Sequence, residues 1–168
     1  MATVNQAYGT YSALAVTALQ SLASSATAGW KSVLQDLQTS RKPIDVEIAV
    51  SLTTANTAPA NDKAAYVYIA PAITTDGGTT WIIADGGTGT LPTSGDAAYT
   101  IASPNDLVLL GVLNYTTQQQ VMQGNFRLSN ACGGSMPSGF IVIIVNYTGA
   151  ALSTSCVVSY RDITQTVA

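Results

Sequence analysis

The chain has 168 residues, of which 47% are hydrophobic and only 9% charged, and its formal net charge is −3. This length suits one domain with a core large enough to fold without disulfides or metals. The sequence contains no histidine, which excludes Ser-His-Asp and Cys-His catalysis and removes the commonest metal ligand.

The few charged residues are scattered along the chain, which bears on the partners that we expect. The six basic residues form no cluster of the kind that nucleic-acid binding requires. No run of about 18 apolar residues occurs, so we expect no membrane span. No N-terminal leader is visible, which predicts synthesis and retention in a cytoplasm. A surface covered by Thr, Ser, Asn and Gln is typical of a protein that packs against other proteins.

Residues 1–15 are predicted to form an extended arm ahead of a single β-sandwich domain over residues 16–168. The arm has no hydrophobic periodicity, and Tyr8 and Tyr11 are its only aromatic side chains. Two interpretations stay open, a frayed terminus and an arm that docks its tyrosines on a neighbouring subunit. Residues 17–23 predict a short helix, because Thr17 can cap it and its leucines fall on one side.

Alternating apolar and polar residues over 44–52 predict a strand with one wet face, on which Asp45 and Glu47 are expected to lie in solvent. A strand is also expected over 30–37. Residues 64–70 predict another strand, which Pro71 either ends or places at a sheet edge.

Turn-forming residues dominate the stretch 74–100, which contains the related sequences Asp76-Gly-Gly-Thr79 and Asp85-Gly-Gly-Thr88. A short strand at 80–83 lies between them, so we expect an insertion that forms a small hairpin over one end of the sandwich. Together with Asp62, the two aspartates are also candidates for calcium, although Asp-Gly is typical of tight turns.

The second half of the chain carries the strongest strand signals. The nearly continuous apolar run 106–113 predicts a central strand, and 118–128 predicts a strand with alternate residues facing the core. Residues 140–145 are all apolar and mostly β-branched, which indicates a strand buried on both faces. We expect it to turn at 146–149 and to form a hairpin with 155–160.

About eight predicted strands, separated by turn signals, indicate an all-β fold. We predict a two-sheet antiparallel sandwich of the jelly-roll kind. An immunoglobulin-like sandwich is the alternative.

Candidate residues for chemistry are few. The single glutamate, Glu47, lies two positions from Asp45, but such a pair suits glycoside hydrolysis only if it lines a cleft. Cys132 and Cys156 are expected to be free, with a bridge between them as the alternative. We therefore predict no catalytic residue, no cofactor and no metal.

Four aromatic residues lie in predicted strands and would form a sugar-binding platform only if they were exposed together: Trp30, Tyr66, Tyr68 and Trp81. Aromatic residues on strands more often pack in the core or on a sheet face.

Several stretches taken together resemble a family of small virion proteins of tailed bacteriophages, the head decoration or cement proteins. They are Leu19-Gln-Ser-Leu-Ala-Ser-Ser-Ala26, Gly29-Trp-Lys-Ser32, Ala58-Pro-Ala-Asn-Asp-Lys-Ala-Ala-Tyr-Val-Tyr68, the Asp76-Gly-Gly-Thr79 turn and Asn146-Tyr-Thr-Gly-Ala-Ala-Leu152.

The resemblance implies a jelly-roll-like sandwich without catalytic residues. It implies a place on the capsid surface of the virion, where the protein clamps neighbouring major capsid subunits, often as a homotrimer. Interfaces of this kind bury aromatic anchors, for which Tyr8, Tyr11, Trp30 and Trp81 are the candidates. The alternative is a receptor- or carbohydrate-binding module of a tail fibre or baseplate.

Overall fold

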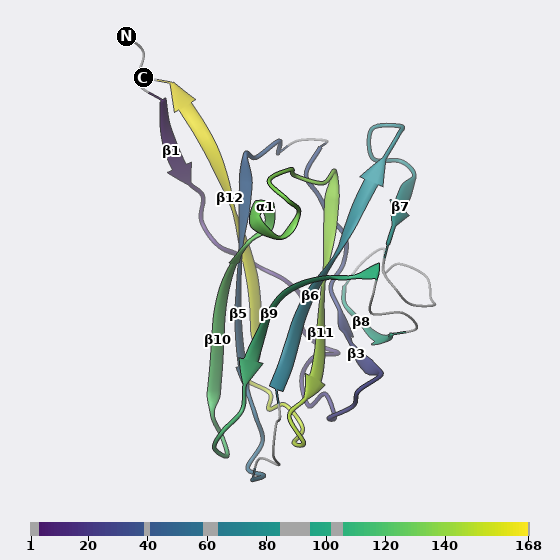
Figure 1. Ribbon diagram of the computed structural model, residues 1–168, viewed down its shortest axis with the longest axis vertical. Coiled ribbons are helices and arrows are strands. Elements are labelled where there is room, and N and C mark those ends of the chain that lie inside the picture. The colour runs from purple at the N-terminus through teal and green to yellow at the C-terminus, as the bar shows by residue number, and fades with distance from the viewer. Residues whose placement is uncertain (1–3, 39–40, 59–63, 85–94, 102–105, 168) are drawn as a thin grey trace.

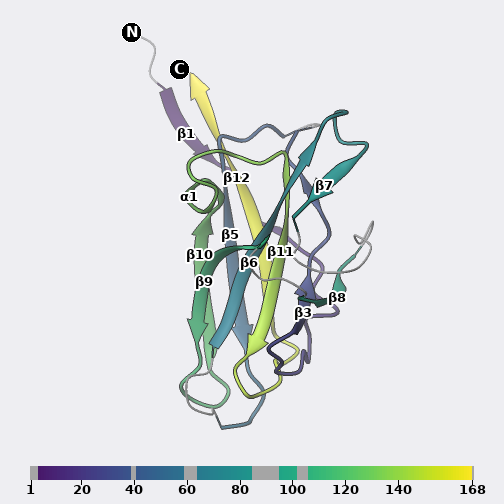
Figure 2. The same ribbon diagram turned by 45° about the vertical axis from the view of Figure 1, so that its right-hand side comes forward.

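The structure is a computed structural model that describes residues 4–38, 41–58, 64–84, 95–101 and 106–167. Two antiparallel sheets face each other, as Figures 1 and 2 show, so the predicted all-β architecture is confirmed. The five-stranded sheet contains β1 (Val4–Tyr8), β12 (Val157–Val167), β5 (Asp45–Thr53) and β10 (Val121–Arg127), with β2 (Ser12–Ala13) beside β12. The seven-stranded sheet contains β7 (Trp81–Ile83), β6 (Ala64–Thr74), β11 (Gly139–Tyr147), β3 (Ala28–Lys31) and β8 (Ala97–Thr100), with β4 (Gln35–Asp36) beside β11 and β9 (Val108–Asn114) beside β6.

Strand β11 is buried on both faces, as its apolar run predicts. Every side chain from Phe140 to Val145 is at most 4% exposed. Phe140, Val142 and Ile144 belong to the core between the sheets. The alternate residues Ile141, Ile143 and Val145 belong to a second cluster that also contains Tyr99 and Leu107. Full burial of each large apolar side chain contributes roughly 1.5–3 kcal/mol, which makes β11 a main source of stability.

The predicted hairpin between 140–145 and 155–160 is wrong. β11 pairs with β6 and β3, whereas β12 lies in the other sheet and pairs with β1 and β5. The predicted turn does form, with Gly149 at φ 83°, but it begins a connection that crosses from one sheet to the other. An apolar run identifies a buried strand and does not specify the sheet that its successor joins.

Strand β5 confirms the predicted alternation. Val46, Ile48, Val50 and Leu52 are at most 2% exposed and face the opposite sheet. Strand β10 also points alternate residues inward, with Met122 at 3% exposure.

Strand β9 was expected to be central, but among the described residues it pairs only with β6 and lies at a sheet edge. Leu109 and Val112 are consequently 48% and 43% exposed. Its Gly111 faces inward, where a Cβ atom would lie 2.4 Å from the Phe126 ring. The absence of a side chain at this position lets the ring fill the space between β9 and β10.

Pro71 does not end β6, which continues to Thr74. β9 pairs with β6 as far as Ile69, and β7 begins to pair at Ala72. The Pro71 carbonyl accepts a hydrogen bond from Ala84 on this side, so its nitrogen also faces the gap between the two partners, where no ladder hydrogen bond is lost.

The helix expected over 17–23 is replaced by turns at 17–21, where the amides of Leu19 and Gln20 both donate to the carbonyl of Val16. The Gln20 side chain bonds the backbone of Cys156, and Ser21 has φ 59°, which no right-handed helix accommodates. The one α-helix in the described residues is the short α1 (Leu128–Ala131). The strand expected over 30–37 is divided into β3 and β4.

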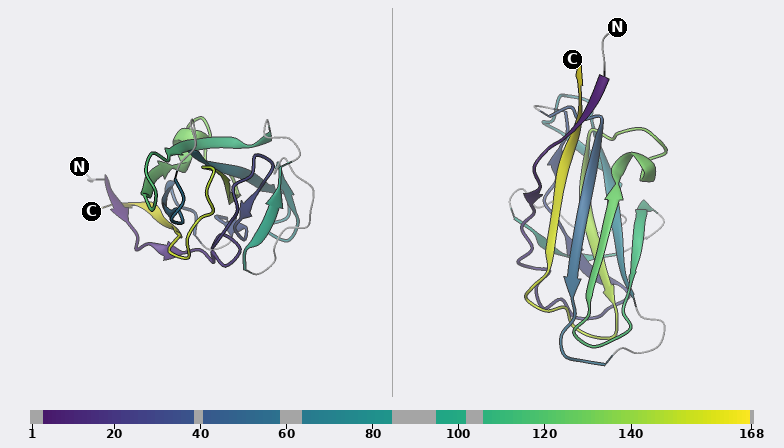
Figure 3. Two further views of the ribbon diagram at one scale, coloured as in Figure 1. Left: turned by 90° about the horizontal axis from the view of Figure 1, so that it is seen from below. Right: turned by 90° about the vertical axis from the view of Figure 1, so that its left-hand side faces the viewer.

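The arm lies against its own domain. β1 and β2 both pair with β12, so residues 4–8 and 12–13 extend the five-stranded sheet. Figures 1 and 3 show β1 and the end of β12 projecting together from one end of the sandwich.

Candidate functional site

A group of exposed and half-buried aromatic and apolar side chains lies on the outer face of the seven-stranded sheet. We call it the tyrosine shelf and define it as Tyr66, Tyr68, Leu109, Val112 and Tyr147. Tyr66 is opposite Val112 and Tyr68 opposite Leu109 in the β6–β9 pair. The Tyr66 and Tyr68 rings are stacked, with their centroids 6.3 Å apart and their planes at 22°. The shelf is therefore a continuous side-chain surface on the paired strands β9, β6 and β11.

A hollow of about 360 Å³ adjoins the shelf, lined by Tyr66, Tyr68, Tyr147, Val145, Ile101, Ala26 and Thr27. The Ile101 amide donates to the Thr27 carbonyl at 2.8 Å, which fixes one wall against the edge of the sheet. Burial, and then the neighbouring Tyr66, raise the pKa of Tyr68, so its phenol stays neutral at ordinary pH. The hollow therefore offers apolar ring surface together with phenol hydroxyl groups.

The sequence indicates parts of this surface, because Tyr66 and Tyr68 alternate with buried residues in a predicted strand. It gave no sign that β9 would lie beside them with Leu109 and Val112 exposed. That arrangement depends on strand pairing, which local periodicity does not report.

The outer face of the five-stranded sheet carries a charged cluster under the arm. Glu47 lies in a cross-strand row between Arg127 of β10 and Arg161 of β12. Its Oε2 is 3.0 Å from Arg161 Nη2 and 3.6 Å from Arg127 Nε. The Tyr11 hydroxyl donates to Oε1 at 2.5 Å. This hydrogen bond and the two arginines lower the pKa of Glu47, and the pKa of Tyr11 is raised by the same hydrogen bond.

The expectation that Asp45 and Glu47 lie in solvent is wrong for Glu47, which is 8% exposed. Asp45 is also engaged, because it accepts hydrogen bonds from the Ser129 amide at 3.0 Å and the Ser129 hydroxyl at 2.8 Å. Asp45 and Glu47 bond arginines and hydroxyl groups, and neither lines the hollow beside the shelf or the polar hollow near the charged cluster. The arm and the arginines that cover it come from distant parts of the chain, so the strand pattern alone did not reveal them.

The two arm tyrosines contact their own chain. The Arg161 guanidinium lies 4.8 Å from the Tyr8 ring centroid and 4.6 Å from that of Tyr11. Arg127 Nη2 donates to the Tyr8 hydroxyl at 3.2 Å. Tyr8 and Tyr11 nevertheless remain 50% and 38% exposed, so each still presents surface.

The tryptophans lie elsewhere, so the four candidate anchors do not form one surface. Trp30 is fully buried in the core and its Nε1 donates to Asp96 at 2.6 Å, so it offers no surface to another subunit. The expectation that Trp30 is an interface anchor is therefore wrong, because none of its surface is exposed. Trp81 is half-buried in β7, where its Nε1 donates to the Gly78 carbonyl at 3.0 Å.

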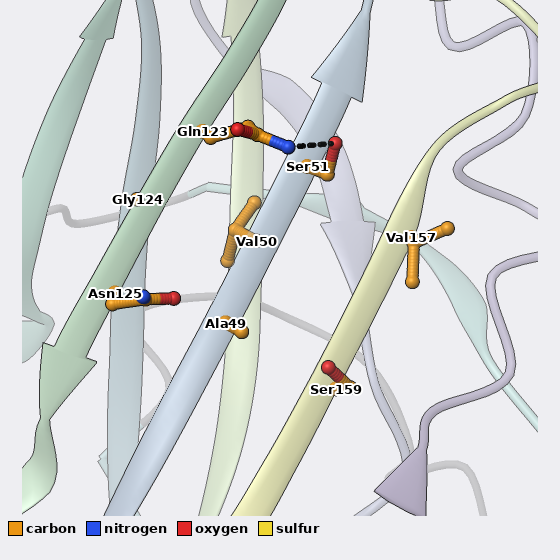
Figure 4. A pocket seen from close by; sticks show the side chains of 8 residues that line it. All are labelled: Ala49, Val50, Ser51, Gln123, Gly124, Asn125, Val157 and Ser159. Carbon is orange, nitrogen blue, oxygen red and sulfur yellow. Dashed lines mark hydrogen bonds between the residues drawn. The ribbon is translucent and has the colours of Figure 1, made fainter. Parts of the chain in front are cut away.

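A polar hollow of about 330 Å³ lies beside the charged cluster, on the outer face of β10, β5 and β12 (Figure 4). The Gln123 amide reaches across to the Ser51 hydroxyl at 3.5 Å. The remaining lining residues are Ala49, Val50, Gly124, Asn125, Val157 and Ser159, none of which is charged. This hollow has no group that could act as an acid or a base.

The Asp76-Gly-Gly-Thr79 sequence forms the turn of the β6–β7 hairpin, as predicted. Asp76 Oδ1 accepts hydrogen bonds from the amides of Thr79 and Thr80 and from the Thr74 hydroxyl, at 3.1, 2.8 and 2.8 Å. On the same hairpin Ile73 and Ile82 are cross-strand partners, 51% and 61% exposed. Asp62 and the related sequence at 85–88 lie outside the described residues.

Other groups that could support chemistry are sparse. No group of at least three His, Cys, Asp or Glu side chains that could bind a metal occurs within the described ranges. Cys132 and Cys156 are both free, and burial raises the pKa of each thiol. No helix in the described part of the chain is long and apolar enough to cross a membrane.

Fold and surfaces together define a two-sheet β protein that presents an exposed aromatic and apolar surface. Comparisons with protein-family models, with curated proteins and with solved structures found no match to the chain.

Proposed function

We propose that this chain is a non-enzymatic structural protein of a bacteriophage virion, a decoration or cement protein of the capsid. It binds the outer head surface and bridges neighbouring major capsid subunits, which stabilises the shell. The role comes from the sequence resemblance. The structural observation that supports it best is the tyrosine shelf, because exposed apolar patches on a folded domain commonly mark protein interfaces.

Bridging requires two contact surfaces on one rigid body. The shelf is one of them, and the exposed Ile73–Ile82 pair on the β6–β7 hairpin supplies a separate apolar surface. Strand β6 carries part of each surface and pairs with the buried strand β11. Force applied to one surface is therefore transmitted to the other through a packed sheet. Many copies on a symmetric shell provide avidity, so each contact need contribute only modestly.

The proposal includes a finer fold assignment, a jelly-roll-like sandwich. Three successive connections support it, because each crosses from one sheet to the other: β9 to β10, β10 to β11 and β11 to β12. It also includes a homo-oligomer, for which the resemblance implies three copies. Tyr8, Tyr11 and Trp81 remain candidate anchors.

The test adds purified protein to capsids that lack it and measures the temperature at which the shells rupture. We expect a higher rupture temperature with the wild-type chain. The double variant Leu109→Ser/Val112→Ser should give a much smaller rise, because it removes exposed apolar surface without opening a cavity. A matched control is Val157→Ser, which changes a side chain of similar exposure (50%) on the other sheet.

The proposal fails if the wild-type chain leaves the rupture temperature unchanged. If Val157→Ser reduces the rise in rupture temperature as much as the shelf variant does, the shelf is not the attachment surface.

A second candidate function is a carbohydrate-binding module of a tail fibre or baseplate, which the hollow beside Tyr66 and Tyr68 favours. Stacked phenol rings present a flat apolar face to a sugar ring, and their hydroxyls offer hydrogen bonds. This candidate predicts a glycan-array signal that Tyr68→Ala abolishes, whereas shell stabilisation predicts no such signal.

A further inference from the structure

β1 and the end of β12 form a two-stranded ribbon that extends past the rest of the sandwich (Figures 1 and 3). The pairing of β12 with β5 stops at Ile163 and Asp45, whereas its pairing with β1 continues to Val167 and Val4. Residues 164–167 therefore have β1 as their one strand neighbour in the described part of the chain. A two-stranded ribbon is only marginally stable in water, so a further strand would stabilise it.

Two hydrogen bonds show which backbone groups of β1 point away from β12. The Gly9 amide donates to the Asp162 carbonyl at 2.8 Å, so Gly9 points toward β12. Because these directions alternate along a strand, Val4, Gln6 and Tyr8 point their N–H and C=O groups away from β12. A second hydrogen bond supports this assignment. The Ile44 amide donates to the Ile163 carbonyl at 2.8 Å, so Ile163, which lies opposite Tyr8, points its backbone groups away from β1.

This outer edge lacks the features that keep natural sheet edges from pairing. The sequence of β1 is Val-Asn-Gln-Ala-Tyr, with no charged residue and no proline, and its register with β12 runs without a bulge. Val4 and Tyr8, on one side of the ribbon, are 56% and 50% exposed. No other strand pairs with this edge within the described residues.

We propose that β1 pairs with β1 of a second copy of this chain, antiparallel and about a two-fold axis at Gln6. In this register Gln6 lies opposite the partner's Gln6, and Val4 lies opposite the partner's Tyr8. Every outward N–H and C=O of Val4, Gln6 and Tyr8 then has a backbone partner. The five-stranded sheet continues into that of the second copy.

The occupant is a second copy because β1 is complementary to itself about Gln6. Two-fold pairing places identical residues together, and an uncharged strand avoids the like-charge contacts that this symmetry would otherwise impose. Val4 against Tyr8 is a favourable apolar–aromatic cross-strand pair. The opposite edge, residues 164–167, is shorter and has no such symmetry. The pairing unit is therefore a dimer rather than the three copies that the resemblance implies, and it is independent of what the shelf binds.

The test measures the mass of the full chain by analytical ultracentrifugation over a range of concentrations. We expect a monomer–dimer equilibrium. Gln6→Pro removes an outward N–H on the axis and leaves the ladder to β12 intact, so it should raise the dissociation constant about tenfold or more. Gln6→Thr keeps the N–H and should change little. Gln165→Pro, on the other edge of the same ribbon, should also leave dimerisation unchanged.

A second variant tests the axis without altering the backbone. Gln6→Glu places two carboxylates opposite each other, so the dimer should dissociate at pH 7 and form again near pH 3, where both are protonated. Far-ultraviolet circular dichroism checks that each variant retains the sandwich.

Three results would overturn the proposal. The first is a wild-type chain that stays monomeric up to its solubility limit. The second is a Gln165→Pro variant that dissociates as Gln6→Pro does, which would indicate head-to-tail pairing through both edges. The third is a dimer of folded Gln6→Glu that is equally stable at both pH values.

Discussion

Asn146 shows how one buried amide shapes the connection between the sheets. Its Nδ2 donates to the carbonyls of Leu22 and Ala150, both at 2.8 Å, and its Oδ1 accepts from the Thr148 hydroxyl at 2.7 Å. The residue is fully buried, so these groups have no water to replace a lost partner.

Asn146→Ala should therefore lower the free energy of unfolding by about 3 kcal/mol, because it removes the buried hydrogen bonds that the amide makes to Leu22, Thr148 and Ala150, each of which contributes about 1 kcal/mol. Urea unfolding measures the change. The matched control is Asn114→Ala, because Asn114 begins a second Asn-Tyr-Thr sequence but is exposed. For this variant we expect the free energy of unfolding to fall by no more than about 0.5 kcal/mol. Equal losses at the two positions would contradict this account of the turn.

The hydrogen bond from Tyr11 to Glu47 leads to a prediction about the pKa of Glu47. The Tyr11 hydroxyl is the main cause of its lowered pKa, so Tyr11→Phe should move the pKa of Glu47 back toward its ordinary value of 4.5. A carboxyl NMR titration measures this. Tyr8→Phe is the control, because the Tyr8 hydroxyl accepts from Arg127 and does not contact Glu47.

The sign of the pH dependence follows from the lowered pKa. The folded chain binds a proton on Glu47 less readily than the unfolded chain does, so the cluster stabilises the fold above the ordinary pKa. That stabilisation disappears as the pH falls through the lower folded value. A pKa of Glu47 that is the same in wild type and in Tyr11→Phe would show that the hydroxyl is not its cause.

At the scale of elements, the β6–β7 hairpin depends on the side chain of its turn aspartate. Hydrogen bonds from Thr80, followed by one from Thr74, lower the pKa of Asp76 from 3.8 to about 2. The ionised carboxylate accepts these bonds, so they are complete above the ordinary pKa and are lost as the pH falls through about 2.

Asp76→Ala should therefore loosen the hairpin at neutral pH, which faster amide hydrogen exchange in β7 would report. Thr74→Val removes one donor and should raise the pKa of Asp76 part of the way to 3.8, measured by NMR titration. Unchanged exchange in Asp76→Ala would show that strand pairing alone maintains the hairpin.

Strands that have a clear local pattern could be predicted from the sequence, but the strands with which they pair could not. The alternation in β5 and the apolar run of β11 specified both strands and their buried faces. The run in β9 looked equally central, yet it lies at an edge, because apolar periodicity does not distinguish a strand with two neighbours from a strand with one. The pairing of 140–145 with 155–160 failed for the same reason.

The candidate surfaces were predictable only in part. Tyr66 and Tyr68 are two positions apart in a predicted strand, which places them on one face, but the shelf also needs β9 beside them. Glu47 was expected in solvent because the strand pattern does not report Arg127, Arg161 or the arm that covers it. Aromatic character alone suggests Trp30 as an anchor, whereas in the structure the side chain is fully buried and its indole bonds the half-buried Asp96.

At the scale of the whole molecule, the sandwich is a rigid body whose contacts lie on different sides. The shelf lies on the outer face of the seven-stranded sheet, and the charged cluster attaches the arm to the outer face of the five-stranded sheet. The ribbon of β1 and β12 extends from one end of the sandwich (Figure 3). This arrangement suits a protein that joins other proteins, because separate surfaces can be occupied together. Sequence resemblance suggests which proteins these are, and imaging of the assembled particle can decide the question.

The most direct measurement is electron cryomicroscopy of virions purified from a host that expresses this chain. We predict density for the sandwich on the outer surface of the head, with the tyrosine shelf against major capsid subunits. Density confined to a tail fibre or baseplate, or a head-bound sandwich whose shelf faces solvent, would contradict the account.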